Sequence, residues 1–132
     1  MIKLSKKGSY ALKAVIYIAE RYPKLIKILD ISKDLEISES LLRRIISELE
    51  KSGVLITTKG RFGGVELGMD IENISFYDIL NSVGEELNIR DCTKGIICDN
   101  VERCSITNIF GDLQKSFNGI LKLYTLDKVI KK

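Results

Sequence analysis

The sequence predicts a mainly helical protein with one small β-hairpin and a long C-terminal helix. Three observations support this fold class. Apolar residues recur at helical spacing in the N-terminal half, two short stretches rich in valine, isoleucine and threonine flank a glycine-containing turn, and apolar residues recur at spacings of three and four near the C-terminus. With 132 residues, of which 45% are hydrophobic, the chain is expected to form one domain, or a small domain with an appended element.

The chain is expected to begin with two helices. In "SKKGSYALKAVIYIAERYP", apolar residues such as Val15 and Ala19 stand at helical spacing. This helix should stop at Pro23, because proline cannot continue a helix. A short second helix is expected in "DISKDLEI", with Asp30 or Ser32 as its N-cap.

The third helix has the clearest amphipathic pattern. It is expected to begin after Ser38 and to end at Gly53. The full capping box is missing because Leu41 stands at its third position, but Glu39 in the first turn suits the helix dipole. The apolar stripe that should face the core consists of Leu42, Ile45, Ile46 and Leu49. Polar residues occupy the opposite face and its flank, namely Ser40, Arg43, Arg44, Ser47 and Lys51.

A basic hairpin is expected after the third helix. The segments "VLITT" and "GVELG" are enriched in strand-forming residues, and the turn "KGRFGG" between them contains three glycines and the cations Lys59 and Arg61. Helix, short helix, amphipathic helix and basic hairpin, in this order, are typical of a winged helix-turn-helix. In that fold the third helix enters the DNA major groove and the wing reaches the backbone or the minor groove.

The predicted DNA-binding residues follow from this arrangement. Serine and arginine can contact base edges, and the basic wing can contact phosphates. The expected contacts to double-stranded DNA are Ser40, Arg43, Arg44 and Ser47 of the third helix, with Lys59 and Arg61 of the wing. The alternative is a small helical core with solvated charges, and the agreement of order, spacing and charge favours DNA binding over it.

The charge distribution is uneven along the chain. Residues 1–64 contain thirteen Lys and Arg against seven Asp and Glu, a net charge of about +6, whereas residues 65–132 contain eight against eleven, about −3. An electrostatic face for a polyanion and a solvated lysine-rich surface both explain this asymmetry.

Several functional classes are not supported by the sequence. The chain has no histidine, no phosphate loop of the G-x-x-x-x-G-K type and no Ser/Asp constellation, so neither an enzyme nor a small-molecule substrate is expected. No apolar run approaches the roughly 18 residues of a membrane span, and the first residues lack the pattern of a signal peptide. We therefore expect a cytoplasmic protein that does not enter a membrane.

Residues 1–72 are expected to form the DNA-binding domain, and residues 73–132 a connector helix, a cysteine loop (residues 91–104) and a dimerisation helix. The segment "ISFYDILNSVGEEL" predicts the connector helix, which should begin near Ser75. The apolar residues that it should bury are Phe76, Ile79, Leu80 and Val83.

The last helix predicts a homodimer. Its apolar face comprises Ile106, Ile109, Phe110, Leu113, Phe117, Ile120, Leu121 and Tyr124. A small domain already closed on its own core cannot bury so long a stripe, so a partner chain is expected. A two-fold dimer would suit a palindromic operator. The alternative is that this face packs on the first helix of the same chain.

All three cysteines, Cys92, Cys98 and Cys104, stand at intervals of six in the cysteine loop. Cytoplasmic thiols stay reduced, and an odd number does not suit a disulfide framework. The spacing does not match the two-residue intervals of a zinc knuckle, whereas three thiolates in a loop can surround an inorganic cluster. An iron-sulfur cluster is therefore favoured over zinc. Redox-active thiols and small buried hydrophobic residues are further alternatives.

Over essentially its whole length, from "KLSKKGSYAL" to "YTLDKV", the chain resembles the bacterial winged-helix family that includes the iron-sulfur cluster regulator IscR and the nitric-oxide-sensing repressor NsrR. The resemblance is carried by "GSYALKAVIYIA", "ISESLLRRIISELEKSGVL", "KGRFGGVELG" and the C-x5-C-x5-C set. It implies a dimeric transcription factor with crossed C-terminal helices. It also implies a cluster, usually 2Fe-2S and sometimes 4Fe-4S, which three cysteines and one further ligand hold and whose loss or modification alters DNA affinity.

The fourth ligand departs from the family pattern. IscR-like members supply a histidine three residues after the third cysteine, where this chain has Thr107. NsrR-like members supply an aspartate just before the tyrosine of the first helix, where this chain has Ser9. Oxygen donors near the cysteines are Asp91, Asp99, Glu102, Thr107 and Asn108, and an external thiol or water is a further alternative. A weakly held cluster would be labile, as expected of a sensor of iron-sulfur status, redox or nitric oxide.

Overall fold

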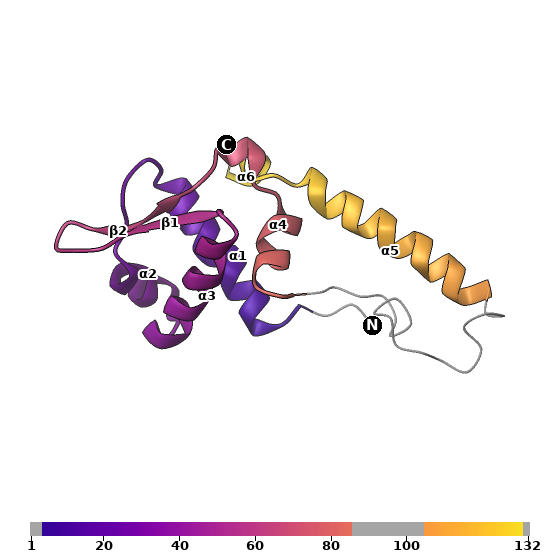
Figure 1. Cartoon of the computed structure of the whole chain (residues 1–132), viewed down its shortest axis with the longest axis horizontal. Helices are drawn as coiled ribbons and strands as arrows, with labels where there is room; N and C mark the ends of the chain where they lie inside the picture. Colours follow the sequence, from indigo (N-terminus) through magenta and orange to yellow (C-terminus); the bar gives the residue numbers. More distant parts are fainter. Residues whose placement is uncertain (1–3, 86–104, 131–132) are drawn as a thin grey trace.

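The computed structural model describes residues 4–85 and 105–130. Its helices and strands are α1 (Lys6–Glu20), α2 (Ile28–Leu35), α3 (Glu39–Lys51), β1 (Leu55–Thr58), β2 (Gly64–Leu67), the 3-10 helix η1 (Ile71–Asn73), α4 (Phe76–Ser82), α5 (Ser105–Leu123) and α6 (Leu126–Ile130). This order confirms the predicted fold class, which is mainly helical with one two-stranded antiparallel sheet. The helices α1 to α4 and the hairpin form one body, and α5 extends from it (Figure 1).

The helix α1 runs through the core of this body. Ala11, Ala14, Val15 and Ile18 are fully buried, and the helix contacts α2, α3, α4, α6 and β2. Its start is fixed by Ser5, whose side chain accepts a hydrogen bond from the Gly8 N–H at 3.2 Å. Such a cap satisfies a backbone donor that the first turn leaves without a helical partner.

The predicted N-cap of the second helix is wrong. The helix α2 begins one turn earlier than expected, with Lys27 at the cap position, so that Asp30 and Ser32 lie inside it. The cause is a contact distant in sequence, because Ile26 pairs with Val65 of β2 through backbone hydrogen bonds of 3.0 and 2.7 Å. This bridge holds residue 26 in an extended segment beside the hairpin, and the helix starts directly after it.

The prediction for the third helix is confirmed. The helix α3 begins after Ser38, whose side chain accepts a hydrogen bond from the Leu41 N–H at 3.4 Å. Its predicted apolar stripe is buried, and Leu42, Ile45 and Leu49 have no exposed surface. Burial of one such side chain contributes about 1.5–3 kcal/mol to folding, so the stripe orients the polar face of α3 outward.

The hairpin follows as predicted, with Leu55 opposite Leu67 and Thr58 opposite Gly64. Two glycines at the base of its loop are required by close backbone contacts. A Cβ atom on Gly63 would lie 2.0 Å from the Thr58 carbonyl oxygen, and one on Gly64 would lie 2.7 Å from that of Ile26. The loop is therefore tightly packed against both β1 and the segment before α2.

The helix α4 begins at Ser75 as predicted, and Ser75 and Asp78 form a capping box. Ile79, Leu80 and Val83 are buried as expected. Phe76 is only half-buried, so its predicted burial is wrong. The Phe76 N–H donates to the Tyr124 carbonyl oxygen at 2.9 Å, so the first turn of α4 lies beside the residue that follows α5.

The C-terminal residues return to the body. The Leu126 N–H donates to the Ile74 carbonyl oxygen at 2.9 Å, and the Leu126 side chain is fully buried in the main core. The helix α5 packs against α4, while its N-terminal end lies far from the body (Figure 1). Four residues of its predicted apolar face are exposed in the single chain, namely Ile109, Leu113, Ile120 and Tyr124.

Candidate nucleic-acid interface

The outer face of α3 presents the predicted DNA-contacting side chains to solvent. Ser40, Arg43, Arg44 and Ser47 are all exposed, and so are Lys59 and Arg61 in the wing. The stripe that anchors α3 in the core is on the opposite side of the helix, so these polar side chains do not compete with packing. The helix can therefore meet a partner without any change in the core.

A groove of about 600 Å³ separates α3 from the wing. Arg43 and Ser47 line it from α3, and Lys59 lines it from the wing. Ser40, Arg44 and Arg61 lie outside its lining. The structure thus brings the two predicted groups of residues to one surface, but only half of them share the groove.

The two neighbouring arginines of α3 differ in their surroundings. Both Nε and Nη2 of Arg43 contact the Glu39 carboxylate, at 2.8 and 2.6 Å. Within residues 4–85 and 105–130, no ion pair is formed by Arg44. A base or phosphate must compete with Glu39 for Arg43, whereas Arg44 is free to bind DNA directly.

The sequence prediction missed Lys27 as part of this surface. The Lys27 Nζ donates a hydrogen bond of 2.9 Å to the Arg61 carbonyl oxygen, and the side chain also lines the groove. Lys27 therefore ties the tip of the wing to the start of α2. Nothing in the local sequence indicates this contact, because it depends on the bridge between Ile26 and Val65.

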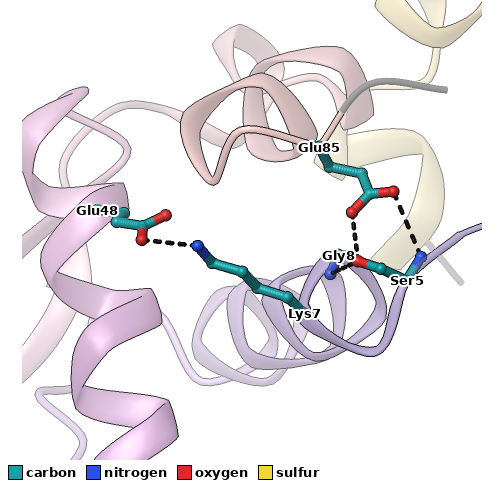
Figure 2. Close-up of polar contacts among 5 residues, drawn as sticks. All are labelled: Ser5, Lys7, Gly8, Glu48 and Glu85. Carbon is teal, nitrogen blue, oxygen red and sulfur yellow. Dashed lines mark hydrogen bonds and ion pairs between the residues drawn. The ribbon is translucent and has the colours of Figure 1, made fainter. Parts of the chain in front are cut away.

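Polar contacts join the first turn of α1 to α3 and to Glu85 (Figure 2). The Lys7 Nζ forms an ion pair with the Glu48 carboxylate at 2.7 Å, which joins α1 to the C-terminal half of α3. On the other side of the same turn, the Glu85 carboxylate accepts hydrogen bonds from the Ser5 backbone N–H and hydroxyl. The first turn of α1 thus contacts both α3 and Glu85, three residues after the end of α4.

A second polar contact joins α1 to α2. The Tyr17 hydroxyl donates to the Asp34 carboxylate, and the Arg21 guanidinium lies 3.5 Å from the centre of the Tyr17 ring. The hydrogen bond to Asp34 and the burial of the ring raise the pKa of Tyr17 above its usual value of 10.0. Tyr17 therefore stays neutral near pH 7 and can donate to Asp34.

The three predicted metal ligands, Cys92, Cys98 and Cys104, lie outside the described residues. Among residues 4–85 and 105–130 there is no group of three side chains from His, Cys, Asp and Glu arranged to hold a metal ion. Ser9, at the position of the NsrR-like aspartate, is half-buried in α1. In the same part of the chain, none of the helices has both the length and the apolar character to cross a membrane.

Comparison with known proteins identifies relatives that match nearly all of this chain. An HTH-type transcriptional regulator NsrR of Bacillus subtilis is 29% identical over 98% of this chain and 91% of its own. An IscR of Vibrio campbellii, also an HTH-type transcriptional regulator, is 29% identical over 98% of this chain and 78% of its own. Both relatives have names that match the family proposed from the sequence.

A solved structure supports the fold. CymR of B. subtilis, described as the global cysteine regulator, superposes with a TM-score of 0.79 over 98% of this chain and 97% of its own, at 22% sequence identity. The model of the Rrf2 family, described as an iron-dependent transcriptional regulator, matches residues 4–132. This match covers both the winged body and α5. The chain is therefore a DNA-binding transcriptional regulator, not an enzyme, and belongs to the Rrf2 family, of the IscR and NsrR type.

Proposed function

We propose that this chain is a homodimeric repressor whose operator affinity depends on an iron-sulfur cluster at Cys92, Cys98 and Cys104. The observation that carries the proposal is the combination of an exposed polar face on α3 and a basic wing with three cysteines between α4 and α5, in a chain matched over residues 4–132 by a family of iron-dependent regulators. Such a regulator acts on the chromosome, which is consistent with a cytoplasmic protein.

The exposed face of α5 supports the homodimer. Ile109 and Leu113 are 57% and 47% exposed, and Ile120 is 50% exposed. An apolar strip of this length in water is unfavourable, and a second copy of α5 would cover it. In a two-fold dimer the two α3 helices would lie on the same side of a DNA duplex, as a palindromic operator requires.

The donor chemistry of the cysteine loop fits an iron-sulfur cluster. Thiolates are the usual ligands of such clusters, and the chain supplies three within residues 92–104. The fourth ligand cannot be imidazole, because the chain has no histidine. An oxygen donor or an external thiol would hold that position weakly. Such a cluster would supply a site that oxidants or nitric oxide can attack, which suits a sensor.

The second candidate is a DNA-binding regulator whose cysteines act as redox thiols or bind zinc. It is favoured by the absence of the family's fourth ligand, because Thr107 stands in place of the IscR-like histidine and Ser9 in place of the NsrR-like aspartate. The fold is also similar to that of CymR, which is described as a global cysteine regulator, and this similarity is compatible with the second candidate. DNA binding and the dimer are common to both candidates.

Purification without oxygen tests the two candidates. Brown protein with visible absorption, and with iron and sulfide in equal amounts, would support the iron-sulfur regulator. Colourless protein with stoichiometric zinc, or with free titratable thiols and no metal, would contradict it and support the second candidate. Cys98→Ala is the matched variant, and it should lose the absorption while keeping its helical circular dichroism.

A further inference from the structure

The tip of the wing carries an aromatic side chain that the DNA-binding surface described above does not use. Phe62 is 87% exposed, more than any other large hydrophobic side chain among the described residues. It does not line the groove between α3 and the wing. A phenyl ring exposed to water contributes little to folding, so this ring is available to a partner.

The backbone holds Phe62 in a defined place. Arg61 and Phe62 are the central residues of a tight turn, which the Gly63 N–H closes by donating to the Gly60 carbonyl oxygen at 3.1 Å. Gly60 has a φ of +110°, which favours glycine. Lys27 anchors the Arg61 carbonyl, and Gly63 and Gly64 pack without room for a side chain. The ring is thus presented on a fixed corner of the hairpin.

The charges around Phe62 suit DNA. Lys59 and Arg61 flank the tip, and the Arg61 guanidinium lies 6.0 Å from the centre of the Phe62 ring. Arg61 thus lies over the ring only at this distance, and Phe62 keeps most of its surface exposed, so both cations can contact phosphates while the ring stays available. A wing beside a helix in the major groove reaches the adjacent minor groove. There apolar side chains can enter between base pairs and kink the duplex.

We propose that Phe62 is a minor-groove wedge that enters a base step beside the operator half-site. Lys59 and Arg61 would hold the phosphates on either side of the groove, and the ring would partly unstack one step. Flexible pyrimidine-purine steps unstack most readily, so Phe62 would add sequence preference at a position without hydrogen bonds to bases. This inference rests on the proposed DNA-binding surface and adds a residue to it.

The test uses the full chain and a duplex that the wild-type protein selects from a random pool. Phe62→Ala should lower affinity about tenfold, which corresponds to the loss of one stacked ring. Phe62→Leu should keep most of the affinity, because leucine also acts as a wedge. The bend, measured by energy transfer between labelled duplex ends, should decrease in Phe62→Ala. The fluorescence of 2-aminopurine at the contacted step should decrease with it, since the base stays stacked.

Arg61→Ala separates the wedge from the DNA surface itself. Removal of a phosphate contact should reduce the salt dependence of binding, whereas Phe62→Ala should leave it unchanged. Unchanged affinity and bend in Phe62→Ala, with a reduced salt dependence in Arg61→Ala, would overturn the wedge but not the DNA surface. If neither variant differs from wild type, both proposals are wrong for the wing. Equal melting temperatures would show that each variant is folded.

Discussion

Arg43 and Arg44 are adjacent in α3, yet their surroundings differ. Arg43 is held by Glu39 along the helix, so its transfer to DNA exchanges one charged contact for another and changes the free energy little. Arg44 has no such ion pair within the described residues, so it can contact DNA without breaking an existing ion pair. At the residue scale, Arg44 is therefore the better candidate for sequence recognition.

Arg44→Ala is expected to lower operator affinity by about 1–3 kcal/mol if Arg44 contacts a guanine. The same variant should discriminate less between operator and unrelated DNA. Fluorescence anisotropy with both duplexes at one salt concentration measures this. Lys13→Ala on α1 removes one positive charge away from α3 and the wing, and it should change both affinities little. Operator affinity equal to that of wild type would contradict the assignment of Arg44.

Tyr17 predicts a dependence of stability on alkaline pH. Its pKa is raised in the folded state by the hydrogen bond to Asp34 and by burial, so folding favours the protonated phenol. This contribution is fully present below the usual pKa of 10.0 and is lost as the pH rises through the folded value. Tyr17→Phe should be less stable than wild type at pH 7, and the difference should shrink above pH 10.

Urea unfolding of wild type and Tyr17→Phe at several pH values measures this difference. Tyr22→Phe is a matched control, because Tyr22 is exposed and lies two residues after the end of α1. The control should follow wild type at every pH. A constant difference between Tyr17→Phe and wild type across the range would show that the phenol does not titrate differently in the folded state.

At the scale of elements, the sequence predicts the helices and strands whose extent follows from a local pattern of apolar and capping residues. The stripe from Leu42 to Leu49 determines both the extent of α3 and its outward face, so the solvent-exposed residues of this helix could be named without coordinates. Ser38 and Ser75 identify helix starts because their caps are local. The hairpin is likewise local, since its two strands are adjacent in the sequence.

Elements that depend on distant contacts were not predicted from the sequence. The start of α2 follows from the pairing of Ile26 with Val65, and the role of Lys27 follows from that start. The helix α6 is too short for a recognisable period, and it is held by the burial of Leu126 and its hydrogen bond to Ile74. The candidate cysteine site stays a prediction, because Cys92, Cys98 and Cys104 are outside the described residues.

The anchoring of the wing by Lys27 gives a prediction for this element. Lys27→Met removes the hydrogen bond to the Arg61 carbonyl, so the wing tip should no longer be held toward α2. DNA affinity should fall by about 1 kcal/mol, the usual contribution of one hydrogen bond. Lys24→Met is the control, because it removes the same charge from an exposed residue nearby. Affinity measurements on both variants at two salt concentrations test this.

A double-mutant cycle shows whether Lys27 acts through the wing. If it does, Lys27→Met should have a smaller effect in an Arg61→Ala background than in wild type. Fully additive effects, with an equal loss in Lys24→Met, would show that Lys27 contributes only its charge.

At the scale of the whole molecule, the single chain leaves the apolar face of α5 exposed to water, and a second chain could cover it. Leu113→Glu should place a charge in the proposed dimer interface and convert the dimer to a monomer. Lys115→Glu is the matched control, because Lys115 is exposed on the same helix and outside the apolar face. Analytical ultracentrifugation distinguishes the two. A Leu113→Glu variant that sediments as an intact dimer would place the interface elsewhere.

In the sequence, the cysteines separate the winged body from the helix that carries the proposed dimer face. In the sequence, they stand between α4, which packs against α1 and α3, and α5, which carries the proposed dimer face. A change in their ligation could therefore alter how the winged body is placed relative to the dimer axis. A dimer must set its two α3 helices about one DNA turn apart, so a small change in this placement changes operator affinity.

Only the difference in cluster stability between the two arrangements of the dimer can drive such a change, so the coupling should be about 1–3 kcal/mol. We expect anaerobic reconstitution with iron and sulfide to change operator affinity at least several-fold. Cys98→Ala should abolish both the visible absorption and this change, while sedimentation shows an intact dimer. Anisotropy titrations of holo and apo protein on operator DNA make the comparison. Equal affinities on every duplex tested would show that ligation of the cysteines does not control DNA binding, even if the cluster itself is present.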